Sequence, residues 1–460
     1  MVNILTVLPS RSMIYHHSLR TLILTIILSG LTWGCTSTSD SADSTPQHDH
    51  SEPEPRSLIL WHALRDQERD NLLADLRAFE EETKIKVRAL ELPHSAFANK
   101  LQVSIPRGNG PDLFIGAHDR VGDWAEAGLV EPLSFWSSPR ELSSYLTPAI
   151  EAFTYQQQLY GLPLSCKALA LFYQPELVAH PPETTDELFA MARAAKNDEV
   201  WGLAYPELDS LYFHAPWLHA HGGRVIDAGT PLLSNSPMRE SVDLVSSLRR
   251  EGLIPPEVNG ALASELFRTK RLAFLINGPW FIAELKQDQK SGKETGRETG
   301  KETKTESDFK WAVAPLPKLS STGAPLAPYL SVEGVMLSAR ARQPQQALKL
   351  ARFLASPKRA ESRMARGEVV AHRDVPAQAL SRAPAWLQVF HRQVSASVPL
   401  SNHPLMKSLW TPAQRALAQS IIYEGDSRSA LEGAQRDVLK SIKIATGAES
   451  VPSGESEARQ

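Results

Sequence analysis

Cysteine is scarce in this sequence, and neither sign of charge dominates it. Cys35 and Cys166 are the only cysteines, which excludes a framework of several disulfides of the kind that stabilises small secreted domains. The 49 lysines and arginines nearly match the 52 aspartates and glutamates, and the net charge of −3 gives no electrostatic reason to expect a nucleic-acid partner. The fold must therefore depend on an apolar core, which a chain of 460 residues is long enough to bury.

Long apolar runs are also lacking, apart from one near the N-terminus. The run Thr21–Leu28 follows several basic residues and is too short to span a membrane comfortably. It leads into Gly34-Cys35, an ending that resembles a bacterial lipoprotein signal, in which the cysteine thiol is acylated. We therefore predict a signal peptide at 1–35 with lipid attached to Cys35. An uncleaved anchor and an ordinary secretory signal are the alternatives.

Three further segments have no apolar periodicity. Residues 36–57 are rich in Ser, Thr, Asp and Pro, residues 286–307 repeat Lys-Glu-Thr-Gly with alternating charge, and residues 445–460 are polar. Such compositions cannot bury enough apolar surface to fold alone. They predict a disordered tether, a charged surface insertion and a disordered tail.

From the end of the tether, strand and helix patterns alternate. Residues 58–61 and 113–115 are apolar runs typical of buried strands, and residues 85–89 alternate between apolar and basic. Helices predicted over 67–80 and near Phe97 separate these strands. This β-α-β-α-β order predicts an α/β fold with a parallel sheet and helical crossovers. The inward stripe of the first helix would consist of Leu72, Leu73, Leu76 and Phe79.

Later elements are marked by helix-start residues. Thr184-Thr-Asp-Glu187 is a capping box. Pro279-Trp280 follows a strand-like run at 272–278 and can open a helix, and Pro344 can open another that runs to Leu354. A last helical pattern runs from Trp410 to Lys440.

Polar residues follow the third predicted strand directly. His118, Asp119 and Arg120 come after Leu113–Ile115, at the carboxyl end of that strand. In open α/β sheets, ligands bind outside the carboxyl ends of the strands. These residues are therefore candidates for one wall of a binding crevice.

Two histidine groups raise the question of a metal site. His118 and Asp119 are adjacent, and His214, His219 and His221 lie in an aromatic-rich segment. Neither group has the spaced ligand set that zinc sites need. We favour a hydrogen-bonding loop and a packed segment respectively, and we predict no metal and no cofactor.

Several motifs occur in an order that resembles one family. The motifs are Leu58-Ile-Leu-Trp61, Gly110-Pro-Asp112, Ala117-His-Asp-Arg120, Ala168-Leu-Ala-Leu-Phe-Tyr173, Tyr212-Phe213, Ile276-Asn-Gly-Pro-Trp280 and Met406–Trp410. Together they resemble the extracellular solute-binding proteins of family 1, most closely the maltose/maltodextrin-binding proteins of ABC importers. The resemblance extends from about Leu58 to about Ile444.

The resemblance implies a two-lobed periplasmic-binding-protein fold, type II-like, in which a hinge joins two lobes that each contain a mainly parallel sheet flanked by helices. One lobe would comprise 58–164 and 315–370, and the other 165–314 and 371–444. It further implies an oligosaccharide ligand bound by hinge closure, delivery to the transmembrane subunits of an ABC permease, and a monomer without enzymatic activity. The protein would be extracytoplasmic and anchored to a bacterial membrane by its lipid.

The resemblance also implies which residues hold the ligand. Asp119 and Arg120 would bond sugar hydroxyls from one lobe, and Asp66 lies where the family has another polar contact. Aromatic side chains would stack on sugar rings from the other lobe, since sugars have apolar C–H faces and a polar rim. The aromatic candidates are Tyr212, Trp280 and Trp410.

This chain departs from the family pattern at two positions. Gly116 replaces an aromatic residue, and Lys167 replaces an acidic one, so a hydrogen-bond acceptor becomes a donor. These changes leave the identity of the sugar open. The alternatives to a transport receptor are a secreted glycoside-acting enzyme that uses Asp119 and Asp66, and a receptor that reports its ligand to a signalling partner.

Overall fold

The computed structural model describes residues 57–133, 138–206, 208, 210–256, 258–294, 310–373, 375 and 377–445. The predicted signal peptide with Cys35, nearly all of the tether, residues 295–307 of the charged insertion and the tail after 445 lie outside the described residues. In the described part, no helix is both long enough and apolar enough to cross a membrane.

The first sheet combines parallel and antiparallel pairs. Strand β1 pairs in parallel with both β2 and β3, as the β-α-β pattern predicted. Strand β13 runs parallel to β14 but antiparallel to β3 and to β6, so the sheet is mixed. In sheet order the strands are β14 (Val398–Pro399), β13 (Tyr329–Leu337), β3 (Leu113–Ala117), β1 (Leu58–His62) and β2 (Val87–Glu91), with β6 (Leu162–Lys167) beside β13.

The second sheet is built around a fully buried strand. All residues of β11, with the sequence Leu-Ala-Phe-Leu-Ile-Asn, are buried, and β11 pairs in parallel with β8 and antiparallel to β7. The order is β12 (Ala312–Ala314), β7 (Ala170–Tyr173), β11 (Leu272–Asn277) and β8 (Trp201–Ala204). Two short ribbons lie outside both sheets: β4 (Thr154–Tyr155) with β5 (Gln158–Leu159), and β9 (Ile226–Asp227) with β10 (Thr230–Pro231).

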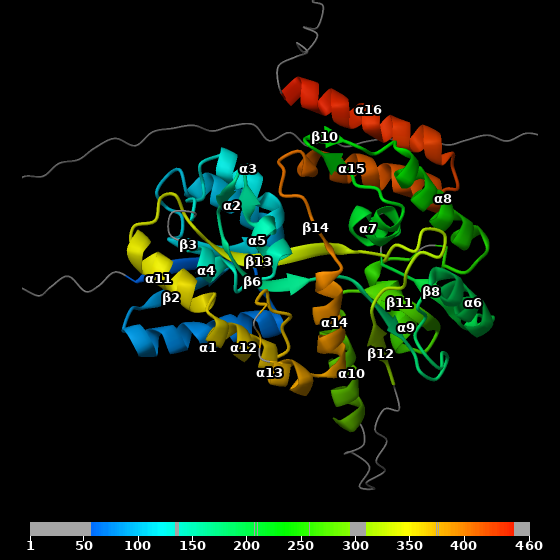
Figure 1. The fold of residues 1–460 in the computed structure, drawn as a ribbon, viewed down its shortest axis with the longest axis horizontal. Helices are drawn as coiled ribbons and strands as arrows, with labels where there is room; N and C mark the ends of the chain where they lie inside the picture. The colour runs from blue at the N-terminus through cyan, green and yellow to red at the C-terminus, as the bar shows by residue number, and fades with distance from the viewer. Residues whose placement is uncertain are drawn as a thin grey trace, which may run out of the picture. The chain divides into compact units, whose positions relative to one another are not determined.

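Helices cover these sheets, as the α/β prediction requires. Figure 1 shows α1, α11 and α12 side by side, and α7, α8, α15 and α16 gathered in another group, in agreement with their contacts. The helices are α1 (Asp66–Thr83), α2 (His94–Ser104), α3 (Val121–Glu126), α4 (Pro139–Leu142), α5 (Thr147–Ala152), α6 (Thr185–Ala195), α7 (Leu211–Ala220), α8 (Ser236–Arg250), α9 (Gly260–Arg268), α10 (Phe281–Glu294), α11 (Pro344–Leu354), α12 (Pro357–Ala365), α13 (Ala377–Arg382), α14 (Ala385–Ser395), α15 (Met406–Leu417) and α16 (Ser427–Ala445), with a 3₁₀ turn η1 (His118–Arg120) and a π turn η2 (Ala418–Ile422).

Helix starts follow the predicted chemistry at several places. The Thr184 side chain accepts from the backbone N–H of Glu187 at 3.3 Å, as the capping box requires. Pro344 is the first residue of α11, whose inward face carries Ala347, Leu350 and Leu354. The predicted start of α11 is therefore confirmed.

Other predicted helix boundaries are wrong. Helix α10 begins at Phe281, so Pro279 and Trp280 form the turn before it. The pattern from Trp410 to Lys440 is not one helix, because Glu424 adopts φ 55° and the chain turns at Gly425 between η2 and α16. Helix α15 begins earlier, at Met406, which places Trp410 in its second turn.

Candidate ligand-binding site

A group of charged side chains lies where the chain passes from the first sheet to the second. It consists of Glu68 in the first turn of α1, Lys167 at the end of β6, and Glu333 in β13. The Lys167 Nζ lies 2.9 Å from a Glu68 carboxylate oxygen and 3.7 Å from Glu333. After Lys167 the chain enters β7 of the second sheet, so the group marks a connection between the sheets.

Burial and charge act in opposite directions on this group. Burial alone lowers the pKa of Lys167, but Glu333 and Glu68 raise that pKa by more, so the ammonium remains protonated. Burial raises the pKa of Glu333, and Lys167 only partly reverses this effect. The group therefore combines a protonated Lys167 with a Glu333 carboxyl group whose pKa is raised.

A ring group lies beside it, formed by Tyr212 in α7, Trp280 before α10 and Tyr329 in β13. The Tyr212 ring centroid is 6.4 Å from that of Trp280 and 6.2 Å from that of Tyr329, both in tilted arrangements. Tyr212 and Trp280 thus meet, as expected of two residues predicted to stack on one ligand.

The two groups are in electrostatic contact. Burial raises the pKa of the Tyr212 hydroxyl, and the nearby Lys167 ammonium partly offsets that increase. Asp119 contributes to the raised pKa of Glu333, so Asp119 also lies within reach of the charged group. Carboxylates and an ammonium group therefore lie beside aromatic rings here, and the side chains come from elements of both sheets and their helices.

Arg120 follows Asp119 in the chain and is exposed to solvent. It ends the 3₁₀ turn η1 that follows β3, its side chain is 45% exposed, and its guanidinium lies 3.8 Å from Asp123. The long distance and the exposure of Arg120 make this a weak pair, which leaves the guanidinium able to turn toward a ligand. Asp119, next to it, is partly buried.

Trp280 is the most exposed of the predicted rings, at 42%. Its six-membered ring lies directly over Gly278, where an added Cβ would come within 2.2 Å of it. Only glycine at 278 therefore permits this position of the ring. An exposed apolar surface of this size can stack against the C–H face of a sugar ring.

Asp66 and Trp410 lie less close to these groups. Asp66 is exposed and is the first residue of α1, with φ 45°, while Arg65 occupies the N-cap position. Trp410 is partly buried against the core in α15, a helix that contacts the ring-bearing α7. Among the recorded ring and ion-pair contacts of the described residues, neither joins the charged group or the ring group.

The histidines have structural roles. The buried His118 donates from Nε2 to the Leu400 carbonyl at 2.7 Å and accepts at Nδ1 from the Val332 N–H at 3.1 Å. Both ring nitrogens are therefore hydrogen-bonded to backbone groups. His214 bonds Ser241 and His219 bonds the Ala327 carbonyl. In the described part of the chain, no cluster of three or more His, Cys, Asp or Glu side chains is arranged to hold a metal ion.

The departure at Gly116 has a packing explanation. An added Cβ there would lie 3.2 Å from the Phe97 ring and 3.4 Å from Trp124, which both pack edge-on against Phe114. A ring at 116 would therefore point into the core and displace these neighbours.

The sequence motifs did not indicate Glu68, Glu333 and Tyr329 as candidate site residues. Glu333 had a visible signal, because it is a lone acidic residue inside the apolar run Leu330–Leu337. Glu68 resembled the ordinary acidic residues of a first helical turn. Only the pairing of β13 with β6 brings Glu333 and Tyr329 to this place.

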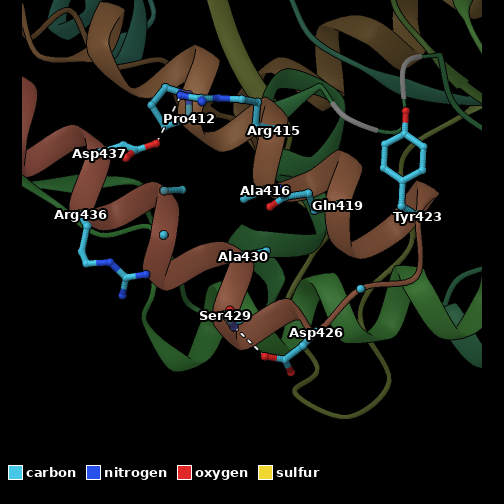
Figure 2. A pocket seen from close by; sticks show the side chains of 13 residues that line it. Pro412, Arg415, Ala416, Gln419, Tyr423, Asp426, Ser429, Ala430, Arg436 and Asp437 are labelled. Carbon is cyan, nitrogen blue, oxygen red and sulfur yellow. Dashed lines mark hydrogen bonds and ion pairs between the residues drawn. The ribbon is translucent and has the colours of Figure 1, made fainter.

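A larger cavity, of about 550 Å³, lies elsewhere, between α15 and α16. Figure 2 shows Arg415 of α15 reaching Asp437 of α16 at one end, and Asp426 accepting from the Ser429 N–H at the other. None of the six side chains predicted to bind ligand lines it. Its size does not outweigh the convergence of charged and aromatic groups described above.

Known proteins resemble this chain over most of its length. Residues 76–385 match the family model described as bacterial extracellular solute-binding protein. A galactooligosaccharide-binding protein of Bacillus subtilis (strain 168) is 25% identical over 410 residues, which cover 84% of this chain and 89% of that protein. A maltotriose-binding protein of Pyrococcus abyssi (strain GE5 / Orsay) is 30% identical over 239 residues, 50% of this chain and 51% of its own length.

A solved structure has the same architecture. It is a cyclo/maltodextrin-binding protein complexed with maltotetraose, which superposes with a TM-score of 0.72 at 26% identity and covers 85% of this chain and 99% of its own. The two-lobed periplasmic-binding fold implied by the sequence motifs is confirmed by this likeness.

Proposed function

Because this chain belongs to the bacterial extracellular solute-binding proteins, we propose that it binds an oligosaccharide and delivers it to an ABC permease. The observation that carries the proposal is the meeting of Tyr212 and Trp280 with Lys167 and its carboxylates. Aromatic faces suit the C–H faces of sugar rings, and charged groups suit their hydroxyl rims. The relatives bind galacto-oligosaccharides and maltotriose, so these are the sugar classes to examine.

The binding mechanism is hinge closure. We assign residues 58–164 and 315–370 to one lobe, and 165–314 and 371–444 to the other. A ligand that contacts both lobes raises the population of the closed form in proportion to its differential affinity. A dissociation constant of about 1 μM corresponds to about −8 kcal/mol, which two or three stacked rings and a charged rim can supply.

Each predicted ligand contact has a role in this mechanism. Asp119 and Arg120 bond hydroxyls from the first-sheet side, with Asp66 at its edge. Tyr212, Trp280 and Trp410 offer ring faces from the second-sheet side. Lys167, with two acceptors already beside it, donates to a ligand hydroxyl.

The same proposal includes attachment to the cell. Lipid on Cys35 would hold the protein at the outer face of a bacterial membrane, and residues 36–57 would tether a monomeric receptor within reach of the permease. Mass spectrometry of the mature protein tests this. An N-terminal peptide that begins at Cys35 and carries diacylglycerol is the expected result, and an unmodified Cys35 would refute the anchor.

The sugar assignment is tested by isothermal titration calorimetry. The panel consists of maltose, maltotriose, maltotetraose and galacto-oligosaccharides, with glucuronate as an anionic control. Binding of at least one neutral oligosaccharide at micromolar concentration is expected. No heat from any of them would refute the proposal. Product formation from malto-oligosaccharides would favour the enzymatic alternative, which the binding-protein relatives do not support.

A further inference from the structure

Three segments that lead from one sheet toward the other lie side by side. Strand β6 pairs with β13, with Ser331 opposite Lys167. A third segment follows α12, and there the Val369 carbonyl accepts from the Cys166 N–H at 2.7 Å. This third segment leads through α13 to α14, which contacts β7 and β12 of the second sheet.

Each of these segments contributes one ionisable side chain to a common neighbourhood. They are Lys167 from β6, Glu333 from β13 and Glu368 from the third segment. Glu368 lies close enough to Glu68 and Lys167 for both to affect its ionisation. The hinge region thus holds a cluster in which carboxylates outnumber the ammonium.

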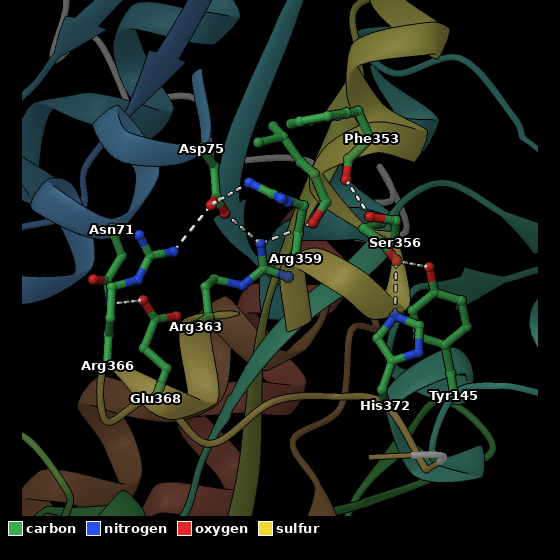
Figure 3. A network of polar contacts seen from close by, with 12 residues as sticks. Asn71, Asp75, Tyr145, Phe353, Ser356, Arg359, Arg363, Arg366, Glu368 and His372 are labelled. Carbon is green, nitrogen blue, oxygen red and sulfur yellow. Dashed lines mark hydrogen bonds and ion pairs between the residues drawn. The ribbon is translucent and has the colours of Figure 1, made fainter. Parts of the chain in front are cut away.

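Among the described residues, the arginines near Glu368 form ion pairs with Asp75 and none with Glu368. Figure 3 shows Asp75 of α1 paired with Arg363 of α12 at 3.0 Å and with Arg366, the C-cap residue of that helix, at 2.9 Å. Arg359 also faces Asp75, at 3.8 Å. Glu368 instead accepts a hydrogen bond from the neutral Asn71 amide.

A small cavity joins these carboxyl groups. Glu68, Glu333 and Glu368 line it together with Asp75 and Arg363, and its volume of about 20 Å³ has room for one water molecule. Apolar side chains such as Leu72 and Leu354 complete its wall. Within this space the Glu68 carboxylate raises the pKa of both Glu333 and Glu368, as like charges do.

We propose that ligand binding is coupled to the uptake of one proton by this carboxyl cluster, with Glu368 as its principal acceptor. The inference rests on the proposed function, because it describes the regulation of that same site. Lobe closure removes water from the cluster, and dehydration favours the neutral carboxyl group. By linkage, the protonated protein binds the sugar more tightly.

The surrounding charges set the range in which this coupling acts. Burial is the main cause of a Glu368 pKa that is raised to about 7; Arg363, the Asn71 hydrogen bond and Lys167 oppose this increase, and Glu68 adds to it. Burial likewise raises the pKa of Glu333, with a contribution from Asp119. A carboxyl pKa raised in this way means that the bound proton is lost as the pH rises through 7, so the affinity falls as the pH rises.

Calorimetry of the full chain with maltotriose tests the coupling, and a galacto-oligosaccharide replaces maltotriose if the latter gives no heat. At pH 7, binding should take up a fraction of one proton. The heats measured in phosphate and in Tris should then differ by that fraction multiplied by the difference between the ionisation enthalpies of the two buffers. Between pH 6 and pH 8 the affinity should fall by about tenfold, within the limit of tenfold per pH unit for one proton.

Two variants locate the proton. Glu368→Gln imitates the protonated side chain, so it should bind with nearly the same affinity at pH 6 and pH 8 and take up no proton. The control Glu361→Gln, on the exposed side of α12, should behave as wild type. Equal heats in both buffers and a flat affinity profile in wild type would overturn the coupling while leaving sugar binding intact. Absence of heat with every sugar would instead refute the proposed function, and the coupling with it.

Discussion

The two sheets contribute different chemistry to the candidate site. The first-sheet side supplies the charged residues Glu68, Asp119, Lys167 and Glu333, from α1, η1, β6 and β13. The second-sheet side supplies Tyr212 and Trp280, from α7 and the turn after β11. Rings can stack on many sugars, whereas a charged set fits only certain hydroxyl arrangements. Affinity should therefore depend mainly on the second side, and selectivity and pH response on the first.

The largest expected effect is on the stability of the first-sheet side. Asp75 is 1% exposed and faces Arg359, Arg363 and Arg366. Asp75→Asn would leave buried guanidinium groups without their counter-charge, which costs about 3–5 kcal/mol in the free energy of unfolding. Denaturant titration measures this, with the exposed Asp70→Asn of the same helix as a control that should change little. Similar midpoints for the two variants would contradict the assigned role of Asp75.

The next effect concerns the second-sheet side. Trp280→Ala removes an exposed ring, so stability should hardly change while sugar affinity falls about 30-fold, the equivalent of about 2 kcal/mol for a central aromatic contact. Trp280→Phe keeps a stacking face and should recover most of the affinity. Calorimetry with the same sugar measures both variants. Unchanged binding in Trp280→Ala would remove Trp280 from the site.

The contrast between the sides also shows what sequence reasoning could reach. Local patterns predicted β1, β3, β11 and the start of α11 because each depends on an apolar run or on a helix-start residue close in sequence. The ring pair of Tyr212 and Trp280 came from the family resemblance, and the structure brings these residues together. Neither inference required knowledge of strand pairing.

Features that depend on distant pairings were missed. The inward stripe predicted for α1 contained only apolar residues, yet the buried face includes Asn71 and Asp75, whose partners lie about 290 residues later in the chain. Strand β13 extends back to Tyr329 because β14 pairs with its first two residues and β6 pairs with those that follow. The charged group of the site follows from these pairings, so the sequence alone could not assemble it.

A smaller effect on sugar affinity, together with a change in sugar preference, is expected at Lys167 on the first-sheet side. Two of the three N–H bonds of Lys167 face Glu68 and Glu333 among the described residues, which leaves the third for a ligand hydroxyl. Lys167→Met keeps a side chain of similar length but removes this charged donor. Affinity should therefore fall about tenfold, which is near the lower end of the free energy that a charged hydrogen bond contributes. A panel of sugars measured by calorimetry should show a reduced preference among them. An equal loss for every sugar would contradict a selective role for Lys167.

The smallest effect on stability is expected at Arg120. Its guanidinium is 3.8 Å from Asp123, and Lys407 Nζ already holds that carboxylate at 2.6 Å. Arg120→Ala should therefore lower the free energy of unfolding by less than about 1 kcal/mol, as for other exposed ion pairs. A ligand contact would show as a loss of affinity far larger than that, whereas Lys407→Ala should alter neither quantity much. If Arg120→Ala changed stability and left binding intact, Arg120 would be a structural residue, and the first-sheet side of the site would depend on Asp119 and Lys167 alone.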